Sequence, residues 1–250
     1  MPKFAATINP LNFMQLVLFD SAVRFQLLPF THTRAIADIR CGIWTQRERW
    51  EHLLALASDT LTEKYLQQVY APRQQAETFL YVNAAVLAST TLVEAVKSLP
   101  SNAVLVSNNL LIAFRSDRFI EDYNFFNQIP EAAQQINFEE PIKSLQHIWD
   151  IFSFNEAAIA TDFSIITKNR KSAPLPSYVT AIAPEHIFVE EGAQLGPCII
   201  NAQSGSVYIG KDAEIMEGVM IRGPLALCEH AALKMGAKIY GATTIGPGSK

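Results

Sequence analysis

The sequence predicts an α/β domain followed by a parallel β-helix. Strand-like apolar runs alternate with amphipathic helical segments up to residue 167, as they do in α/β domains. From residue 209 onward, branched aliphatic residues recur every six positions, a period that fits neither a helix nor a single strand. Residues 168–181 lie between these regions and are rich in Lys, Arg, Pro and hydroxyl side chains, as linkers often are. We therefore predict a first domain at 1–167, a linker at 168–181 and a β-helix at 182–250.

The strands of the first domain are predicted from short apolar runs. They are expected at residues 14–19, 78–83, 103–106 and 110–114. Helices alternate with them, so we expect a three-layer domain around a mostly parallel sheet. Ligands of such sheets bind beyond the carboxyl ends of the strands.

The helices are predicted from spacing and capping signals. Apolar residues from about Ile36 follow a helical period, and another helix is expected at 90–99. Thr60 and Glu63 have the spacing of a capping box, which predicts a helix after Ser58 and Asp59. Ser153 and Glu156 have the same spacing and predict a further helix there.

The six-residue repeat divides residues 209–250 into seven units. The first position of each unit is branched and aliphatic: Ile209, Ile215, Ile221, Leu227, Leu233, Ile239 and Ile245. In a parallel β-helix each unit is a short strand and a corner, and this side chain points into the coil. The register extends back through units that start at Val189 and Leu195, with Ala193 and Ile199 at the fifth positions. Residues 201–208 then form a longer corner loop.

Composition excludes several classes of protein. The formal net charge of −4 gives no general attraction to nucleic acid or to an anionic membrane. Cys41, Cys198 and Cys228 are widely spaced and odd in number, which argues against a disulfide scaffold or structural zinc and favours a reducing compartment. No apolar run approaches the length of about 18 residues that a membrane span needs, and no signal-peptide core is present. We expect a cytoplasmic protein that binds neither nucleic acid nor membrane.

Three stretches resemble a group of bacterial sugar nucleotidyltransferases: residues 17–51, 147–172 and 209–247. The order of the parts also resembles the bifunctional N-acetylglucosamine-1-phosphate uridylyltransferases. The resemblance implies a Rossmann-like nucleotidyltransferase domain and a left-handed β-helix of hexapeptide repeats, which commonly assembles as a trimer. It implies that a nucleoside triphosphate and a sugar 1-phosphate react, with Mg²⁺, to give a nucleotide sugar and pyrophosphate.

The way the six-residue repeat ends indicates whether the sequence is a whole protein or a fragment. The seventh unit ends at Lys250 without a helix or polar cap, whereas solenoids normally cover their last coil. The resembling group continues for more coils, so we expect a fragment of a longer protein. An acetyl-CoA site would then belong only to that longer protein.

The resemblance places candidate residues around the first strand. Active members of such families have a glycine-rich loop there that cradles phosphates, but residues 19–34 contain no glycine. Arg24 falls near the arginine of that loop and Arg34 near a later lysine, so both are candidates for phosphate binding and catalysis. The alternative is that both are surface or sheet-capping residues.

The metal carboxylate of the family has no direct counterpart. The matching strand end reads Val82-Asn83-Ala84, where active members have an aspartate. An amide cannot replace an anionic metal ligand, so Asn83 becomes a candidate for binding a nucleotide or sugar phosphate. Asp20, at the end of the first strand, is the candidate metal ligand, with a loop cap as the alternative.

Three functions remain open at this point. The first is sugar nucleotidyl transfer. The second is acyl transfer to a sugar or nucleotide sugar through the β-helix, with His230 as candidate base and an outward polar side chain as the alternative. The third is a catalytically degenerate module that binds a nucleotide or sugar, or that serves assembly, as the missing glycines and Ala84 suggest.

Overall fold

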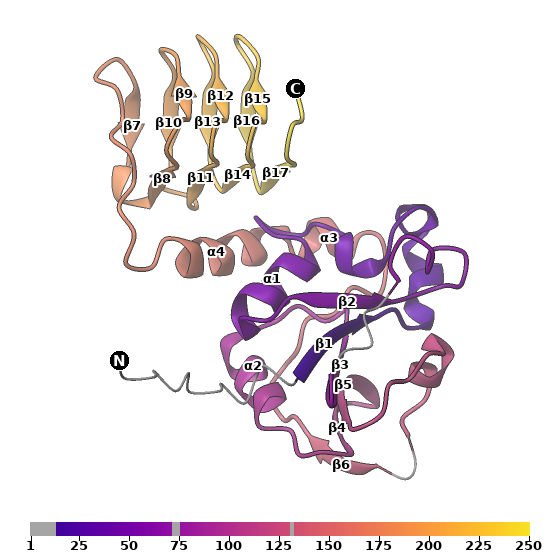
Figure 1. The fold of residues 1–250 in the computed structure, drawn as a ribbon. Coiled ribbons are helices and arrows are strands. Elements are labelled where there is room, and N and C mark those ends of the chain that lie inside the picture. Colours follow the sequence, from indigo (N-terminus) through magenta and orange to yellow (C-terminus); the bar gives the residue numbers. More distant parts are fainter. Residues whose placement is uncertain (1–13, 72–75, 131–132) are drawn as a thin grey trace, which may run out of the picture. The chain divides into compact units, whose positions relative to one another are not determined.

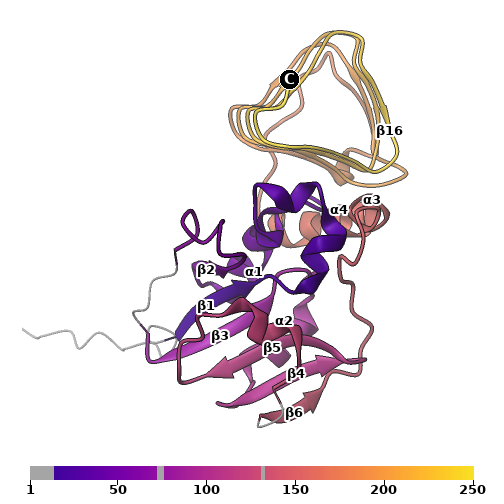
Figure 2. The same ribbon diagram turned by 90° about the vertical axis from the view of Figure 1, so that its right-hand side faces the viewer.

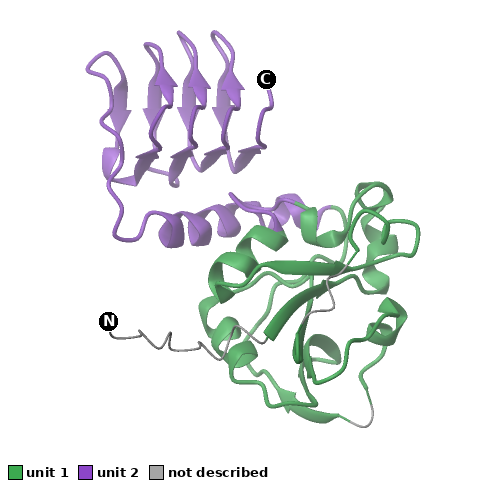
Figure 3. Ribbon diagram, viewed as in Figure 1, with its two compact units in different colours: residues 1–39, 46–148 green, residues 40–45, 149–250 purple. Residues whose placement is uncertain are grey.

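The structure is a computed structural model that describes residues 14–71, 76–130 and 133–250 (Figures 1 and 2). The chain divides into two compact units (Figure 3). Unit 1 falls within residues 1–39 and 46–148, and unit 2 comprises residues 40–45 and 149–250. The predicted linker lies inside unit 2, where the backbone N–H of Ala173 donates to the carbonyl of Val189 at 2.9 Å. The predicted division into domains at 167 and 182 stays a prediction.

Unit 1 contains a six-stranded mixed sheet in the order β2-β1-β3-β5-β4-β6. Its strands are β1 (Met14–Phe19), β2 (Ser58–Leu61), β3 (Thr78–Asn83), β4 (Ala103–Ser107), β5 (Leu110–Ser116) and β6 (Gln134–Asn137). β1 is parallel to β2 and β3, and β4 is parallel to β6, but β5 is antiparallel to both of its neighbours. All four predicted strands are present. The antiparallel β5 starts beside the end of β3, so the turn between β4 and β5 lies at the carboxyl ends of β1 and β3.

Two predicted helices of unit 1 differ from the structure. The helix expected from about Ile36 begins only at α1 (Gln46–Leu54), and short 3₁₀ turns precede it: η2 (Ala22–Leu27), η3 (Phe30–His32) and η4 (Ile36–Asp38). The helix predicted after Ser58 and Asp59 is wrong, because Ser58–Leu61 is strand β2, paired with β1, and residues 64–69 form turns. Pairing along a buried sheet outweighs a local capping pattern. The helix predicted at 90–99 is present as α2 (Thr90–Lys97), capped by Ser89, whose hydroxyl accepts from the N–H of Leu92.

Aromatic side chains fix the loop after β5 on one face of the sheet. Phe126, in η5 (Tyr123–Asn127), lies with its ring centroid 4.3 Å from that of Phe19 and 4.9 Å from that of Tyr81. Phe19 and Tyr81 are fully buried in the same cluster. This packing holds the residues that follow Phe126 close to the end of β1.

Unit 2 contains three parallel sheets, in the orders β16-β13-β10-β7, β17-β14-β11-β8 and β15-β12-β9. The strands are β7 (Thr180–Ile182), β8 (Ile187–Val189), β9 (Gln194–Leu195), β10 (Ile199–Asn201), β11 (Val207–Ile209), β12 (Glu214–Ile215), β13 (Met220–Arg222), β14 (Leu225–Leu227), β15 (Ala232–Leu233), β16 (Lys238–Tyr240) and β17 (Thr243–Ile245), and a 3₁₀ turn, η6 (Pro184–His186), precedes β8. Seen end on, the coils trace a triangle (Figure 2). This arrangement is consistent with a parallel β-helix, and its left-handedness stays a prediction.

The strand pairing repeats every 18 residues from β11 onward, or three units of six. Ile209 pairs with Leu227, and Leu227 with Ile245. The units predicted upstream at Val189 and Leu195 are in register, since they pair with Ile209 and Ile215. The corner loop predicted at 201–208 is shorter in the structure, because Asn201 belongs to β10, in which Ile200 pairs with Ile221. Residues 198–200 are all apolar, so the period by itself could not choose among them. Pairing with the neighbouring coil makes the choice.

One outer face of unit 2 is covered by α3 (Asp150–Ser153), α4 (Asn155–Ile166) and residues 40–45, which we call the strap. Ile43 of the strap packs with Ile159, Ile166 and Ala226. The backbone N–H of Ile43 donates to Oδ2 of Asp162 at 2.9 Å. The helix predicted after Ser153 is thus present as α4. Its predicted capping box is not formed, since the residue before α4 is Phe154, which makes no side-chain cap.

Neither unit has a membrane-spanning helix among the residues that the structure describes, since none of their helices combines the necessary length and hydropathy.

Candidate functional site

A pocket of about 200 Å³ lies at the carboxyl ends of β1 and β3. We call it the strand-end pocket. Its walls come from the loop after β1, the turn between β4 and β5, the η5 segment and two separate amides. The lining residues are Ser21, Ala22, Val23, Asn83, Asn109, Leu110, Leu111, Phe126, Asn127, Gln128, Ile129 and Gln146. The pocket is therefore where ligands of α/β sheets generally bind.

Asn83 and the β4–β5 turn shape one wall of the pocket. Nδ2 of Asn83 donates to the carbonyl of Leu111 at 2.9 Å, and Oδ1 accepts from the N–H of Ala85 at 3.0 Å. These bonds tie the chain after β3 to the start of β5. Asn108 and Asn109 both have positive φ, 47° and 64°, as in the hairpin turns that favour asparagine and glycine. The turn brings Asn109 to the pocket wall.

The polar groups of the pocket are amides and one hydroxyl. Besides Asn83, two amides bond to neighbours: Nε2 of Gln146 donates to Oγ of Ser144 at 2.8 Å, and Nδ2 of Asn127 to Oδ1 of Asn124 at 3.2 Å. The side chains of Asn109 and Gln128 have no hydrogen bond to any residue in the described ranges. No Asp, Glu, Lys, Arg or His belongs to the lining. The pocket thus offers neutral groups that can both donate and accept.

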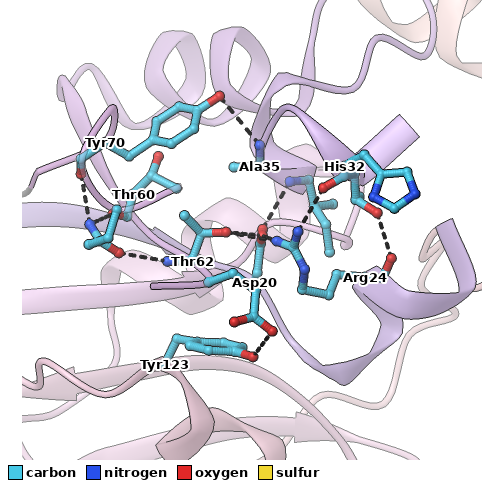
Figure 4. A network of polar contacts seen from close by, with 12 residues as sticks. Asp20, Arg24, His32, Ala35, Thr60, Thr62, Tyr70 and Tyr123 are labelled. Carbon is cyan, nitrogen blue, oxygen red and sulfur yellow. Dashed lines mark hydrogen bonds and ion pairs between the residues drawn. The ribbon is translucent and has the colours of Figure 1, made fainter. Parts of the chain in front are cut away.

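Asp20 and Arg24 form a buried ion pair close to the first strand (Figure 4). Nη1 of Arg24 lies 2.6 Å from Oδ2 of Asp20 and 2.8 Å from Oγ1 of Thr62. Nη2 donates to the carbonyl of Thr31 at 2.7 Å and to the hydroxyl of Tyr65 at 3.1 Å. The side chain of Arg24 is only 2% exposed and that of Asp20 is 0% exposed. This geometry favours the structural alternative for Arg24, because its guanidinium already binds the protein itself.

The carboxylate of Asp20 is also engaged on both oxygens. Oδ1 accepts from the N–H of Ile36 at 2.9 Å, and Oδ2 accepts from Oγ1 of Thr62 at 2.5 Å. Burial raises the pKa of Asp20, and these bonds together with Arg24 oppose the rise. The described residues contain no group of three His, Cys, Asp or Glu side chains suited to a metal ion. Since Mg²⁺ is usually held by one or two carboxylates together with substrate phosphates, the Mg²⁺ that the resemblance implies stays a prediction.

The other predicted site residues lie outside the strand-end pocket lining. Arg34 is exposed on the segment between η3 and η4. His230 is exposed at a coil corner of unit 2, with φ of 55° and Nδ1 3.9 Å from Oδ2 of Asp212. Of the predicted residues, only Asn83 lines the pocket. The sequence reading missed Asn109 and Gln128, although two adjacent asparagines between predicted strands are a turn signal.

Comparison with known families assigns the class of protein. The sequence profile of the family described as sugar nucleotidyl transferase matches residues 16–171, more than half of the chain. The chain therefore belongs to the sugar nucleotidyl transferase family. A comparison with curated proteins gives no match. The matched region contains most of β1, all of β3 and the whole lining of the strand-end pocket.

Proposed function

We propose that unit 1 is a sugar nucleotidyltransferase. A phosphate oxygen of the sugar 1-phosphate would attack the α-phosphorus of a nucleoside triphosphate. The bond from that phosphorus to the β-phosphate would break, and pyrophosphate would leave with the electron pair. The observation that carries this proposal is the strand-end pocket, which lies at the carboxyl ends of β1 and β3 inside the family match.

The residues of this site would act by binding and orientation. Asn109 and Gln128 would hold a polar ring of the substrate, which would place the reacting groups together at a low entropic cost. Arg34 is the exposed cation of the segment that follows η3, and we propose that it contacts the phosphates. Mg²⁺ would arrive as the complex of the triphosphate, as part of the substrate.

The test is calorimetric binding of UTP and of dTTP with Mg²⁺, followed by assays of pyrophosphate release with sugar 1-phosphates. Binding that weakens in Arg34→Ala supports the proposal. Arg118→Ala is the matched control. Arg118 is also exposed, but it lies two residues after Ser116, which pairs with Phe79 near the start of β3. It is therefore at the end of β3 opposite to the pocket. Absence of binding to every triphosphate would contradict the proposal.

A catalytically degenerate binding module is the second candidate, and the buried ion pair favours it. The glycine-free loop after β1 is folded as η2, and Arg24 and Asp20 bind each other instead of facing the pocket lining. Such a module would bind a nucleotide or nucleotide sugar without releasing pyrophosphate from any pair of substrates. Acyl transfer through His230, with acetyl-CoA, would instead require coenzyme A binding that His230→Ala weakens.

We also propose that unit 2 associates with copies of itself, as a trimer. The outer face of sheet β16-β13-β10-β7 carries Met220, Arg222, Lys238 and Tyr240, which are all exposed. The pocket beside β9 and β12 includes the carboxylates Glu214 and Glu217. In the trimer, the face with Arg222 and Lys238 on one copy would contact the face with Glu214 and Glu217 on the next copy. Contacts between two different faces of identical chains can close into a ring. Light scattering of the wild type and of Arg222→Glu tests this, and a monomeric wild type would contradict it.

A further inference from the structure

The segment between η3 and η4 carries an exposed cation on a firmly held backbone. Arg34 is exposed, whereas Thr31 and Ala35, close to it on either side, are fully buried. The side chain of Arg34 forms no hydrogen bond or ion pair with any residue in the described ranges, so all five of its donors are available to a ligand. A cation on a fixed backbone loses less freedom on binding than one on a mobile loop.

The phenol of Tyr65 holds the backbone that precedes Arg34. Its hydroxyl donates to the carbonyl of His32 at 2.9 Å and accepts from Nη2 of Arg24 at 3.1 Å. Arg24 is itself fixed by its ion pair with Asp20, at the end of β1. The hydroxyl has a single proton, and accepting from Arg24 leaves that proton for His32. The buried ion pair is therefore connected, through Tyr65, to the backbone two residues before Arg34.

The phenol of Tyr70 holds the backbone that follows Arg34 (Figure 4). Its hydroxyl accepts from the N–H of Ala35 at 3.3 Å and donates to the carboxylate of η4 at 2.6 Å. The next N–H along the chain, that of Ile36, donates to Oδ1 of Asp20 at 2.9 Å. Side chains thus bind the backbone on both sides of Arg34 and leave its own side chain free.

The two phenols come from one segment, which a glutamine fixes to the sheet. Nε2 of Gln67 donates to the carbonyl of Thr60 at 3.0 Å and to that of Tyr70 at 2.9 Å. Its Oε1 accepts from the N–H of Thr62 at 3.1 Å. Thr60 belongs to β2, so the segment that carries Tyr65 and Tyr70 is anchored at the edge of the sheet. The phenols can therefore transfer the rigidity of the sheet to the segment around residue 34.

We propose that Tyr65 and Tyr70 are positioning residues for phosphate binding, because they hold the backbone on both sides of Arg34 and so fix where its guanidinium meets the triphosphate. This inference rests on the proposed function, in which Arg34 contacts the phosphates. Neither phenol touches the substrate. Their contribution to affinity acts through Arg34, and removing either hydroxyl lets the cation move away from the position in which it binds.

Calorimetric titration of the full chain tests the two phenols. UTP, dTTP, ATP, CTP and GTP, each with Mg²⁺, are titrated into the wild type, and the tightest of them then serves as the probe for the variants. Tyr65→Phe and Tyr70→Phe keep the ring and remove the hydroxyl. We expect each to weaken binding of the probe about threefold to tenfold, the net value of one hydrogen bond.

Tyr123→Phe is the matched control for these variants. The hydroxyl of Tyr123 donates to a carboxylate oxygen of Glu63 in the same unit, but it makes no hydrogen bond to residues 31–36. The control should therefore lose a phenol hydrogen bond and still bind the probe as the wild type does. Thermal unfolding followed by circular dichroism checks that every variant is folded at the temperature of the titration.

A double-mutant cycle separates positioning from a general loosening of unit 1. If the phenols act through Arg34, then Tyr65→Phe should change the affinity for the probe by less than about twofold once Arg34→Ala is present. A role in stability alone would not produce this dependence on residue 34. The same test applies to Tyr70→Phe.

Two outcomes would overturn the inference and leave the proposed nucleotidyl transfer intact. In the first, Tyr65→Phe and Tyr70→Phe bind the probe as tightly as Tyr123→Phe, so the phenols only stabilise the fold. In the second, Tyr65→Phe weakens binding equally with and without Arg34→Ala, so it acts by another route. If the wild type binds none of the five triphosphates, both the inference and the proposed function fail.

Discussion

Replacement of Arg24 by methionine should destabilise unit 1 strongly. The side chain of Arg24 is only 2% exposed and makes four side-chain hydrogen bonds, of which the one to Asp20 is also an ion pair. Methionine removes the charge, so the carboxylate of Asp20 stays buried and keeps, among the described residues, its bonds from Thr62 and Ile36. Breaking a buried ion pair on one side costs about 3–5 kcal/mol. For a protein of this size that corresponds to a fall in Tm of about 6–20 °C.

The double variant Asp20→Asn/Arg24→Met separates the lost charge pair from lost packing. It leaves no charge buried, so we expect it to be about 2 kcal/mol more stable than Arg24→Met. Urea unfolding followed by fluorescence measures both values. Trp44→Phe and Trp149→Phe in the background leave Trp50, which is fully buried in unit 1, as the reporter.

The pH dependence of Arg24→Met gives a further check. The variant lacks two of the contacts that lower the pKa of Asp20, so the pKa in the folded state rises further above its usual value of 3.8. A carboxyl with a raised folded-state pKa favours folding at low pH, and that contribution is lost as pH rises through the folded-state pKa. The destabilisation should therefore be smaller near pH 4 than near pH 7. A loss of less than about 1 kcal/mol in Arg24→Met, together with lost UTP binding, would refute the structural role and support the phosphate-binding alternative.

Three other measurements test the fold. Ile200→Ala should lower the free energy of unfolding by about 2–5 kcal/mol, because Ile200 is fully buried inside the coil. Ile199→Ala should lower it by less than about 1 kcal/mol, because Ile199 is 38% exposed. Equal losses in the two variants would contradict the observed register. Gly42→Ala should lower the Tm of the protein, because φ of Gly42 is +88° and a Cβ there would lie 2.5 Å from Oδ2 of Asp162. An unchanged Tm would argue against this close contact between the strap and α4. Burial raises the pKa of Tyr81 to about 12. The free energy of unfolding should therefore fall between pH 10 and pH 12, by up to about 1.4 kcal/mol per pH unit. Unfolding followed by circular dichroism should show that Tyr81→Phe lacks this part of the loss.

The elements that the sequence predicted well are those whose pattern is local. β1 and β3 are continuous apolar runs that are buried as expected, and α2 follows its helical period and its Ser89 cap. β2 was missed because its local signal was that of a helix start, while its conformation depends on pairing with β1. The same reason explains why the corner loop predicted at 201–208 was too long, since Asn201 belongs to β10 through its pairing with Arg222.

The site was predictable in position but not in its residues. The rule that ligands bind at the carboxyl ends of strands placed it near Asp20 and Asn83, and Asn83 does line the pocket. The partners of Arg24 could not be read from the sequence, since Thr62 and Tyr65 are about 40 residues away in the chain. Asn109 and Gln128 come from two further segments that meet only in the folded sheet.

The sequence by itself determined four strands of the first sheet (β1, β3, β4 and β5), the six-residue period and the family, because each of these is a property of neighbouring residues or of their spacing. Only the tertiary structure decided which charges are available for chemistry. Arg24 and Asp20 look like binding residues along the chain, but folding buries them together, and a buried charge is stable only when it is paired. The pairing of these two side chains leaves the strand-end pocket lined by neutral amides, and this decides what kind of ligand it can hold.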